Sequence, residues 1–298
     1  MLNNRKEPEA LVQQGAEKGR DRVCGEGTRW NNFTDIRFEK FSFVLVRPKA
    51  AGNIGAAARA LKNMGFSDLR LVEPHGFAWP AAAAMAAHAE DVLRGASVHP
   101  DLSQALSGQT LTVGTTCRRG AYRNRARELR DWAGSLATAA VSNRIAVIFG
   151  PEDNGLSNQE LMLCDQLITI PAAAGYTSLN LAQAVMLVAY ELMMALRGLS
   201  AGIAPGEESA RLARIARAPV GAVQAMLERL ERALAEIGFL PAENPERIMF
   251  AIREILGRSG LTQRETDILN GIASQIRWFA EDGYHTLALK RRSGRKIR

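Results

Sequence analysis

The stretch FSFVLVRPKAAGNIGAAARALKNMG, residues 41–65, decides the fold class because it contains a strand, a loop and a helix in succession. Residues 41–46 form a continuous apolar run, which is typical of a strand buried on both faces. Residues 53–64 have the spacing of a helix, and Gly65 suits the left-handed position that closes one. A buried strand followed at once by a helix is the repeating unit of parallel sheets.

The same alternation continues to about residue 200. Further strands are predicted at 69–72, around Val98, and at 110–113, 144–149 and 167–170. Further helices are predicted at 80–94, after Asp101, and at 127–141, 157–164 and 178–199. We therefore predict an α/β fold, a mostly parallel sheet with helices on both faces.

Composition divides the chain into five predicted segments, which are residues 1–39, 40–200, 201–219, 220–283 and 284–298. The first is polar without apolar periodicity, and we expect a disordered tail. The second is the α/β domain, and the third is a linker rich in Gly, Ala and Pro. The fourth is a small all-helical domain, with amphipathic helices predicted at about 220–237, 245–259 and 262–280. The fifth is a basic tail.

The overall composition points to a folded protein with an anionic partner. Hydrophobic residues make up 47% of the 298 residues and charged residues 23%, which is typical of globular proteins. The formal net charge is +7, which suits nucleic acid or an anionic membrane surface as a partner. The most apolar stretch, Leu179–Leu196, contains Asn180, Gln183 and Glu191, so we interpret it as a buried helix and expect no membrane segment.

The cysteine and histidine residues indicate a cytoplasmic protein without a metal site. Cys24, Cys117 and Cys164 are scattered and odd in number, which argues against a disulfide framework and fits a reducing compartment. The four His residues have no spacing typical of metal ligands. The first forty residues lack the apolar core of a secretory signal. We therefore expect cytoplasmic localisation and no metal.

Four motifs follow predicted strands, and ligands bind at the carboxyl ends of such strands. The motifs are RPKAAGNIGAAAR at 47–59, GTTCRR at 114–119, FGPEDNGLS at 149–157 and YTSLNLAQA at 176–184. The first lacks the GxGxxG pattern of dinucleotide sites, and from spacing alone Asn53 could be a helix N-cap and Arg59 a solvated residue. In the third, Glu152 is a possible general acid or base. In the fourth, Ser178 is expected to cap a long helix.

An arginine-rich segment begins at the second motif. Six arginines fall in thirteen residues, at positions 118, 119, 123, 125, 127 and 130. Arginine binds phosphate through two hydrogen bonds and stacks on bases, which suits RNA. The alternative is a solvated loop without a ligand.

Taken in order, the four motifs resemble those of the SPOUT family of RNA methyltransferases, most closely its TrmJ branch. The resemblance covers about residues 41–199, and residues 220–280 look like the helical domain that this branch carries. It implies a trefoil knot near the C-terminal end of the α/β domain, which generic folding rules would not predict. It also implies that S-adenosylmethionine (SAM) binds inside that knot, mainly through backbone groups.

The resemblance assigns roles to particular residues of this chain. The implied cofactor-binding residues are Thr115, Thr116, Cys117, Gly150, Ile170, Thr177, Ser178 and Leu179. The implied catalytic residues are Arg59 and Asn53. The expected substrate-binding residues are Arg118, Arg119, Arg123 and Asn180. Cys117 stands where small residues such as Ala are usual in the family.

The implied reaction is methylation of the ribose 2′-oxygen of a pyrimidine at nucleotide 32 of the tRNA anticodon loop. The expected partners are tRNA and a second copy of the chain, because the family forms homodimers with the active site at the interface. Two alternatives stay open. One is 2′-O-methylation of another tRNA position or of rRNA. The other is a non-catalytic RNA-binding protein on the knotted scaffold, against which the pairing of Asn53 with Arg59 argues.

Overall fold

The computed structural model describes residues 37–75, 78–118, 123, 126–202, 214–241 and 243–283. The predicted basic tail, all but three residues of the predicted N-terminal tail, and most of the predicted linker lie outside these ranges. Within them, seven strands form one sheet: β1 Phe41–Val46, β2 Asp68–Val72, β3 Ser97–His99, β4 Leu111–Thr115, β5 Arg127–Glu128, β6 Ile145–Phe149 and β7 Gln166–Thr169.

The sheet has the strand order β3-β2-β1-β6-β4-β7-β5, and every pair of neighbouring strands is parallel. Every residue of the central strands β1 and β6 is buried, as their continuous apolar runs predict. In β1 and β6, Phe43 and Phe149 stack with ring centroids 6.2 Å apart. The predicted α/β class with a parallel sheet is confirmed.

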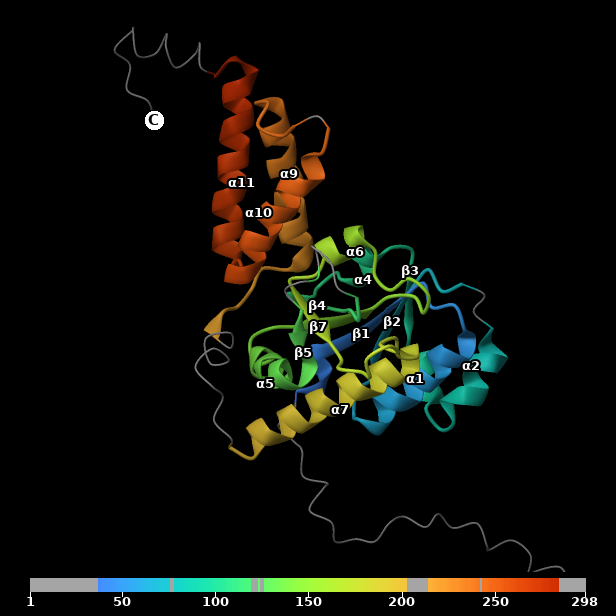
Figure 1. Cartoon of the computed structure of the whole chain (residues 1–298). Coiled ribbons are helices and arrows are strands. Elements are labelled where there is room, and N and C mark those ends of the chain that lie inside the picture. Colours follow the sequence, from blue (N-terminus) through green and yellow to red (C-terminus); the bar gives the residue numbers. More distant parts are fainter. Residues whose placement is uncertain are drawn as a thin grey trace, which may run out of the picture. The chain divides into compact units, whose positions relative to one another are not determined.

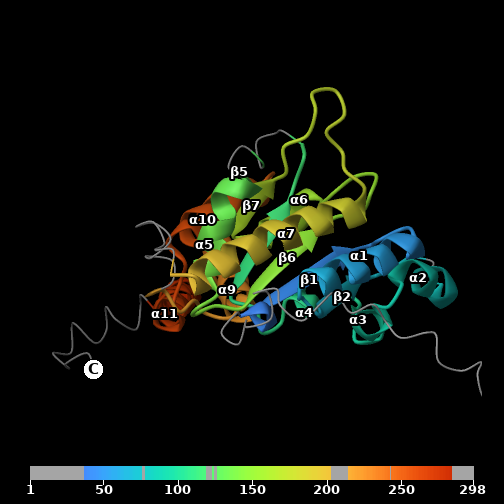
Figure 2. The ribbon, with the colours of Figure 1, turned by 90° about the horizontal axis from the view of Figure 1, so that it is seen from below.

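Helices cover both faces of the sheet (Figures 1 and 2). The helices of this part are α1 Ala51–Asn63, α2 Trp79–Ala86, α3 Glu90–Arg94, α4 Leu102–Ala105, α5 Leu129–Ala139, α6 Asn158–Met162 and α7 Leu181–Ser200. Figure 2 shows α1, α5 and α7 side by side over one face of the sheet. The apolar residues of α4 and α6 pack on the other face, against Val44, Val46, Ala146 and Ile148.

Helix α1 is held tightly against α2 by a glycine. A Cβ atom on Gly55 would lie 1.9 Å from the carbonyl oxygen of Ala82, so a residue with a side chain could not occupy this position without moving a helix. Small residues therefore fix how α1 lies on the molecule. This matters for function because α1 carries both Asn53 and Arg59.

Two predicted helices differ from those observed. The predicted helix at 80–94 is two helices, α2 and α3, because Ala87 and His88 adopt left-handed backbone conformations with φ of 30° and 69°. The predicted helix at 127–141 begins two residues later, because Arg127 and Glu128 pair with β7 as the edge strand β5. The break between α2 and α3 could not be predicted from the amino acids, since neither left-handed residue is a glycine or asparagine.

Three further helices, α9 Val220–Glu236, α10 Pro245–Ser259 and α11 Gln263–Trp278, follow the linker. They surround an apolar cluster that includes Met226, Leu227 and Met249. As predicted from its spacing, Thr262 forms a capping box with Glu265 at the start of α11. We retain the division into an α/β domain and a helical domain as a proposal.

Contacts join the start of the helical segment to the sheet. The backbone N–H of Val220 donates to the carbonyl oxygen of Gln109 at 2.8 Å. Asp165, directly before β7, accepts from the backbone N–H and the hydroxyl of Thr112, both at 3.0 Å, and lies 4.0 Å from the guanidinium of buried Arg217. The N-terminal end of β7 is therefore tied to the segment that leads into α9.

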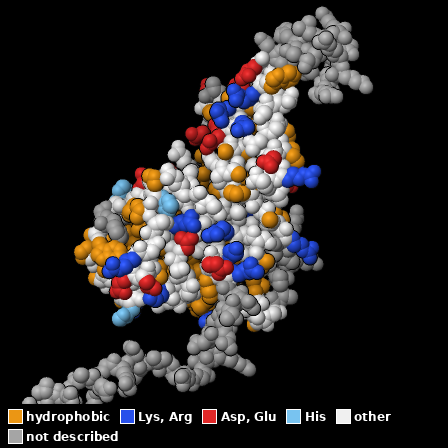
Figure 3. Space-filling model, turned by 180° about the vertical axis from the view of Figure 1, so that it is seen from behind, with side chains coloured by type: hydrophobic (Ala, Val, Ile, Leu, Met, Phe, Trp, Pro, Cys, Tyr) orange, Lys and Arg blue, Asp and Glu red, His pale blue; other side chains and the backbone are white. Residues whose placement is uncertain are grey.

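The surface carries both signs of charge and one long apolar helix. Figure 3 shows basic and acidic side chains intermixed on the face opposite to that of Figure 1. Among the described residues, α7 is the one helix long and apolar enough to cross a membrane by length and composition. One face of it packs against α1 and α5 over the sheet, but Leu187, Tyr190 and Met194 are exposed, so the helix is buried on one face only and not throughout as predicted.

Candidate functional site

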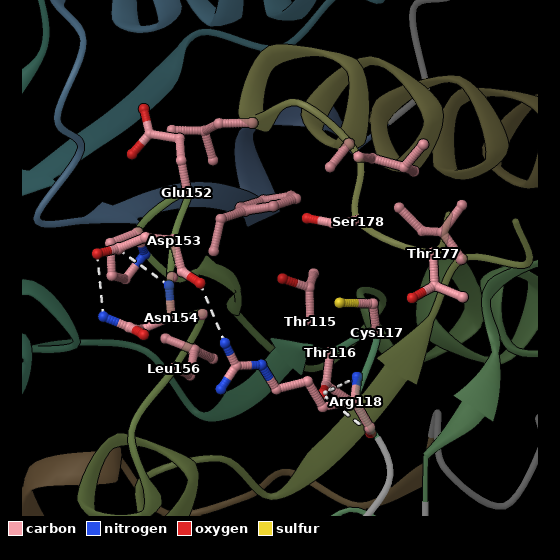
Figure 4. A pocket seen from close by; sticks show the side chains of 18 of the residues that line it. Thr115, Thr116, Cys117, Arg118, Glu152, Asp153, Asn154, Leu156, Thr177 and Ser178 are labelled. Carbon is pink, nitrogen blue, oxygen red and sulfur yellow. Dashed lines mark hydrogen bonds between the residues drawn. The ribbon is translucent and has the colours of Figure 1, made fainter. Parts of the chain in front are cut away.

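The loops that follow β4, β6 and β7 surround a cavity of about 280 Å³, here called the strand-end cavity. Its lining comes from residues 115–118 and 149–156, together with Arg123, Ile170, Thr177, Ser178, Leu179, Leu181 and Ala184. Such a volume is close to the lower end of sites for small molecules, about 300–1,000 Å³. Figure 4 shows Thr115, Cys117 and Ser178 around the middle of the cavity.

All eight residues that the resemblance implied for cofactor binding line this cavity. They are Thr115, Thr116, Cys117, Gly150, Ile170, Thr177, Ser178 and Leu179. They come from three segments at least twenty residues apart in sequence, which the parallel sheet brings to one edge. The sequence therefore predicted which residues come together, and their role in binding a cofactor remains a proposal.

The walls of the cavity are fixed by main-chain contacts. The backbone N–H of Thr116 donates to the carbonyl oxygen of Ile168 at 2.9 Å, and the hydroxyl of Thr115 donates to that of Ile148 at 3.0 Å. A Cβ atom on Gly150 would lie 2.2 Å from the backbone nitrogen of Leu156. The loop after β6 therefore folds back directly over Gly150, and this close approach requires glycine.

Two arginines of the second motif reach across to the loop after β6. The guanidinium of Arg118 donates to the carbonyl oxygen of Asp153 at 3.0 Å, as Figure 4 shows. The guanidinium of Arg123 donates to the carbonyl oxygen of Leu156 at 3.0 Å. Both arginines line the strand-end cavity. Arg119, the third expected substrate-binding arginine, lies outside the described residues.

Asn53, Glu152 and Asn180 form a hydrogen-bonded chain beside the cavity. The side-chain N–H of Asn53 donates to Glu152 Oε1 at 2.8 Å, and the side-chain N–H of Asn180 donates to Asn53 Oδ1 at 3.0 Å. Asn180 Oδ1 in turn accepts from the backbone N–H of Ala182 at 2.9 Å, at the start of α7. The chain joins the loop after β6 to the first turns of α1 and α7.

This chain corrects two capping expectations. Asn53 is not the N-cap of α1, because the helix begins at Ala51 with Ala50 as the cap residue. Its side chain is thereby free to bridge two elements. Ser178 does not cap α7, because Asn180 is the N-cap of that helix. Ser178 instead lines the strand-end cavity, with its hydroxyl toward the middle (Figure 4).

Glu152 organises this region as an ionised acceptor. Burial tends to raise the pKa of its carboxyl group, but the hydrogen bonds from Asn53 and from the backbone N–H groups of Lys49 and Ala50 outweigh burial, so the pKa lies below its ordinary value. Figure 4 shows the carboxylate pointing away from the middle of the cavity. A carboxylate so engaged is a poor general acid or base, which argues against the role considered from the sequence.

Arg59 lies on a different surface from the strand-end cavity. It is exposed on α1 and lies on a shallow, mostly apolar surface formed by α1, α2 and α7, here called the α1/α7 surface. The surface is lined by Ala56, Arg59, Ala60, Asn63, Met85, Leu179, Ala182, Gln183, Met186 and Leu187. Among the described residues, no hydrogen-bond acceptor or carboxylate holds its guanidinium. Leu179 lines both this surface and the strand-end cavity.

The organising role of Glu152 was not predicted from the sequence. A glutamate three residues after one buried strand, together with an asparagine in the first turn of the helix that follows another, is the signal that could have indicated it. Within the described ranges, no group of three or more His, Cys, Asp or Glu side chains is placed to hold a metal ion.

Comparisons with known proteins identify the family of this chain. The profile of the SpoU rRNA Methylase family matches residues 40–190, and that of the tRNA methyltransferase TrmJ C-terminal domain matches residues 221–286. The tRNA (cytidine/uridine/adenosine-2′-O-)-methyltransferase TrmJ of Pseudomonas aeruginosa is 36% identical over 80% of this chain and 93% of its own length. The tRNA (cytidine/uridine-2′-O-)-methyltransferase TrmJ of Pectobacterium atrosepticum is also 36% identical, over 80% and 97%.

Solved structures give the same assignment. The crystal structure of TrmJ from Z. mobilis ZM4 superposes with a TM-score of 0.68 at 31% identity, over 79% of this chain and 98% of that one. A probable methylase family protein from Haemophilus influenzae superposes with a TM-score of 0.53 at 32% identity, over 82% and 98%. The reading as a non-catalytic scaffold is thereby set aside, and the chain belongs to the SpoU methylase family of RNA methyltransferases, in its TrmJ branch.

Proposed function

We propose that this protein is a SAM-dependent tRNA 2′-O-methyltransferase that acts on a pyrimidine at nucleotide 32 of the anticodon loop. The observation that carries the proposal is the 36% identity, over 80% of the chain, to relatives named as tRNA 2′-O-methyltransferases. The choice of nucleotide 32 and of a pyrimidine rests on the resemblance of the four motifs alone. We also expect the protein to be cytoplasmic, where tRNA is available.

The strand-end cavity is the proposed SAM site. Its walls are small side chains and main-chain groups at three strand ends, and the Gly150 cradle lets the backbone approach a ligand closely. We propose that Thr115, Thr116 and Gly150 hold the adenosine part, with Ser178 and Leu179 closing over it. When bound there, SAM supplies a methyl group activated by its sulfonium.

Arg59 is proposed to stabilise the negative charge that develops on the ribose 2′-oxygen. A 2′-hydroxyl is a poor nucleophile near pH 7, so it has to be aligned and relieved of its proton. Arginine stays protonated in proteins, which makes it a poor base and a good partner for an alkoxide. We therefore assign Arg59 to charge stabilisation.

The chain of Asn53, Glu152 and Asn180 is proposed to position this machinery. Glu152 accepts from Asn53, which fixes the direction of its amide, and the Asn53 oxygen then accepts from Asn180. The first turns of α1 and α7 are thus held in one arrangement. Because α1 carries Arg59 and the start of α7 borders the strand-end cavity, their spacing sets where Arg59 can reach.

A second copy of the chain is proposed to complete the active site. The α1/α7 surface is mostly apolar, and on α7 the exposed side chains of Leu187, Tyr190 and Met194 extend it. Exposed apolar patches of this kind often mark protein interfaces. Arg59 lies within that surface, so a twofold dimer through it would present Arg59 to the strand-end cavity of the partner.

A second candidate function has an observation in its favour. The matching family profile is described as an rRNA methylase family, so rRNA is the alternative substrate class. The discriminating experiment offers labelled SAM with total tRNA or with total rRNA from cells that lack the gene. The proposal expects label in tRNA, and mass spectrometry of the nuclease fragments should locate it at nucleotide 32. Label confined to rRNA would overturn the proposal.

A further inference from the structure

A second cavity lies on the other side of the loop after β6, and the proposed reaction does not use it. This cavity, here called the basic groove, has a volume of about 470 Å³. Its lining residues are Arg47, Lys49, His75, Arg118, Arg123, Pro151, Asp153, Asn154, Gly155, Leu156, Ser157 and Asn158. It shares Arg118, Arg123 and the loop itself with the strand-end cavity. The two cavities are therefore neighbours.

Two of its positive charges are fixed in place without being neutralised. Arg118 and Arg123 donate to carbonyl oxygens of the loop and not to carboxylates. A main-chain carbonyl carries no net charge, so it orients a guanidinium and leaves its charge available to a ligand. An arginine held in this way loses little side-chain freedom when an anion arrives.

Two more cations come from the segment directly after β1. Arg47 forms an ion pair with Glu160 and lies 3.8 Å from Glu73. The hydrogen bond with Glu160 raises the pKa of Arg47 above its ordinary value, against an opposing effect of burial. Arg47 and Glu73 both have left-handed backbones, with φ of 45° and 44°, so a strained turn holds each side chain at this edge.

Lys49 and Asp153 form an ion pair at the rim of the groove, where both side chains are about half exposed. Asp153 is the one carboxylate among the described lining residues. Because Glu160 neutralises Arg47 and Asp153 neutralises Lys49, the uncompensated positive charge of the groove comes from Arg118 and Arg123. The excess of positive charge lies beside the proposed methyl-transfer site.

We propose that the basic groove binds backbone phosphates of the RNA strand next to the methylated nucleotide. This inference rests on the proposed function, because it takes RNA as the substrate. Phosphodiester oxygens match what the groove offers, since arginine presents a planar fork to them and lysine a mobile point charge. These contacts set where the strand lies and add affinity for any sequence. The groove is therefore not expected to distinguish one base from another.

Lys49 and Lys62 provide a matched pair of variants for the test. Each forms an ion pair with one aspartate, Lys49 with Asp153 and Lys62 with Asp91, and each is about half exposed. Lys62 is on α1, away from the groove. Lys49→Met and Lys62→Met therefore remove equal charge and break equivalent surface ion pairs, but only one of them changes the groove.

The experiment measures binding of an unmodified tRNA transcript to each full-length protein by filter binding over a range of salt concentrations. Lys49→Met should weaken binding about threefold to tenfold near physiological salt and lower the slope of log K against log salt by about 0.9, the value for one lost phosphate contact. Lys49→Arg should restore the slope. Lys62→Met should match the parent, and SAM affinity measured by calorimetry should be equal in all four proteins.

The outcomes separate this inference from the proposed function. If the parent methylates tRNA but Lys49→Met keeps its salt slope, or if Lys62→Met loses as much, the groove does not contact phosphate and the inference is wrong. If the parent neither binds nor methylates tRNA, the proposed function fails, whatever the variants do. Thermal melting of each variant shows whether a lost slope reflects unfolding, and Lys49→Arg tests the same contact with the charge retained.

Discussion

The strand-end cavity and the α1/α7 surface differ in how complete they are within one chain. The walls of the cavity are fixed by main-chain hydrogen bonds and by the close approach of Leu156 to Gly150. The α1/α7 surface is shallow and mostly apolar, and its charged residue, Arg59, has no partner among the described residues.

A single chain therefore builds the proposed methyl-donor half of the site, the strand-end cavity. It leaves the proposed alkoxide-stabilising half, Arg59 on the α1/α7 surface, exposed. Met85 and Leu187 beside Arg59 are exposed, and no described residue offers its guanidinium an acceptor. This arrangement supports the proposal that Arg59 serves a ligand or a partner.

Replacing Arg59 tests the exposed half. Arg59→Ala should cut methyl transfer at least about a hundredfold, the usual scale for losing a charge-stabilising group, and leave SAM affinity nearly unchanged. Arg59→Lys should rescue little if the planar fork matters. Steady-state kinetics with tRNA, together with calorimetry for SAM, separate the two effects. Lys62→Ala, one turn further along α1, is the control, and activity of Arg59→Ala close to that of the parent would make Arg59 a solvated residue.

Replacing Gly150 tests the enclosed half. Its missing Cβ faces the backbone of Gly155 and Leu156, so Gly150→Val would displace the loop and disturb the local fold. Gly150→Ala should weaken SAM binding at least about tenfold and cost about 1–3 kcal/mol of stability, as overpacking does. Gly134→Ala is the control, because nothing lies within 4 Å of its added Cβ. Calorimetry and urea unfolding report the two effects, and unchanged SAM affinity in Gly150→Ala would contradict the proposed cofactor site.

Replacing Glu152 tests the connection between the two halves. Glu152→Gln keeps the shape but weakens the acceptor for Asn53, so we expect a roughly tenfold loss of kcat with little change in SAM affinity. The pKa of Glu152 is lowered in the folded protein, so its contribution to stability is full above the unfolded-state pKa and is lost as pH falls through the folded-state value.

The free energy of unfolding of Glu152→Gln, measured in urea, should therefore fall below that of the parent at pH 7. The gap should close as pH falls below about 4. A gap that stays constant with pH would show that the Glu152 carboxylate is not held in its charged form.

The turn at Ala87 and His88 belongs to neither half and should give the smallest effect. Both residues have left-handed backbones, which cost non-glycine residues about 1–2 kcal/mol each. Ala87→Gly relieves that strain but gives the unfolded chain more freedom, so we expect a gain of up to about 1 kcal/mol in urea unfolding. Methyl transfer should not change, and a change in activity would extend the functional region to the turn between α2 and α3.

The sequence predicts the sheet well because buried parallel strands are continuous apolar runs. Residues 41–46 match β1 without any difference in bounds, and the other strands differ by one or two residues at an end. Features that depend on neighbouring elements, and not on the local amino acids, are harder to predict. The left-handed pair that separates α2 from α3 and the two-residue strand β5 both depend on what neighbouring elements require.

The candidate site also has a part that could be predicted from the sequence and a part that could not. All eight residues that the resemblance of four motifs implied line the strand-end cavity, because each motif directly follows a strand and the parallel sheet brings those strand ends together. It did not indicate that the Asn53 side chain joins Glu152 to Asn180, which lie 99 and 127 residues further along the chain, since such contacts depend on how loops meet in space. The trefoil knot stays a prediction.

The central claim is that Arg59 of one copy serves the strand-end cavity of the other, and mixed dimers test it most directly. Cys117 is exposed and lines the cavity with its sulfur toward the middle (Figure 4), so Cys117→Trp should block the site without disturbing packing. Chains carrying Arg59→Ala and Cys117→Trp are co-expressed with different tags, and the mixed dimer is isolated by two affinity steps. Methyl transfer to tRNA is then measured.

We predict about half the parent's activity in this mixed dimer. One of its two sites then combines the open cavity of the Arg59→Ala chain with the intact Arg59 of the Cys117→Trp chain. A mixed dimer of the parent chain with a chain carrying both substitutions should be nearly inactive, since neither site is then complete. The reverse pattern, an inactive first dimer and a half-active second, would show that Arg59 acts on the cavity of its own chain. Failure to recover any mixed dimer would contradict the claim as well.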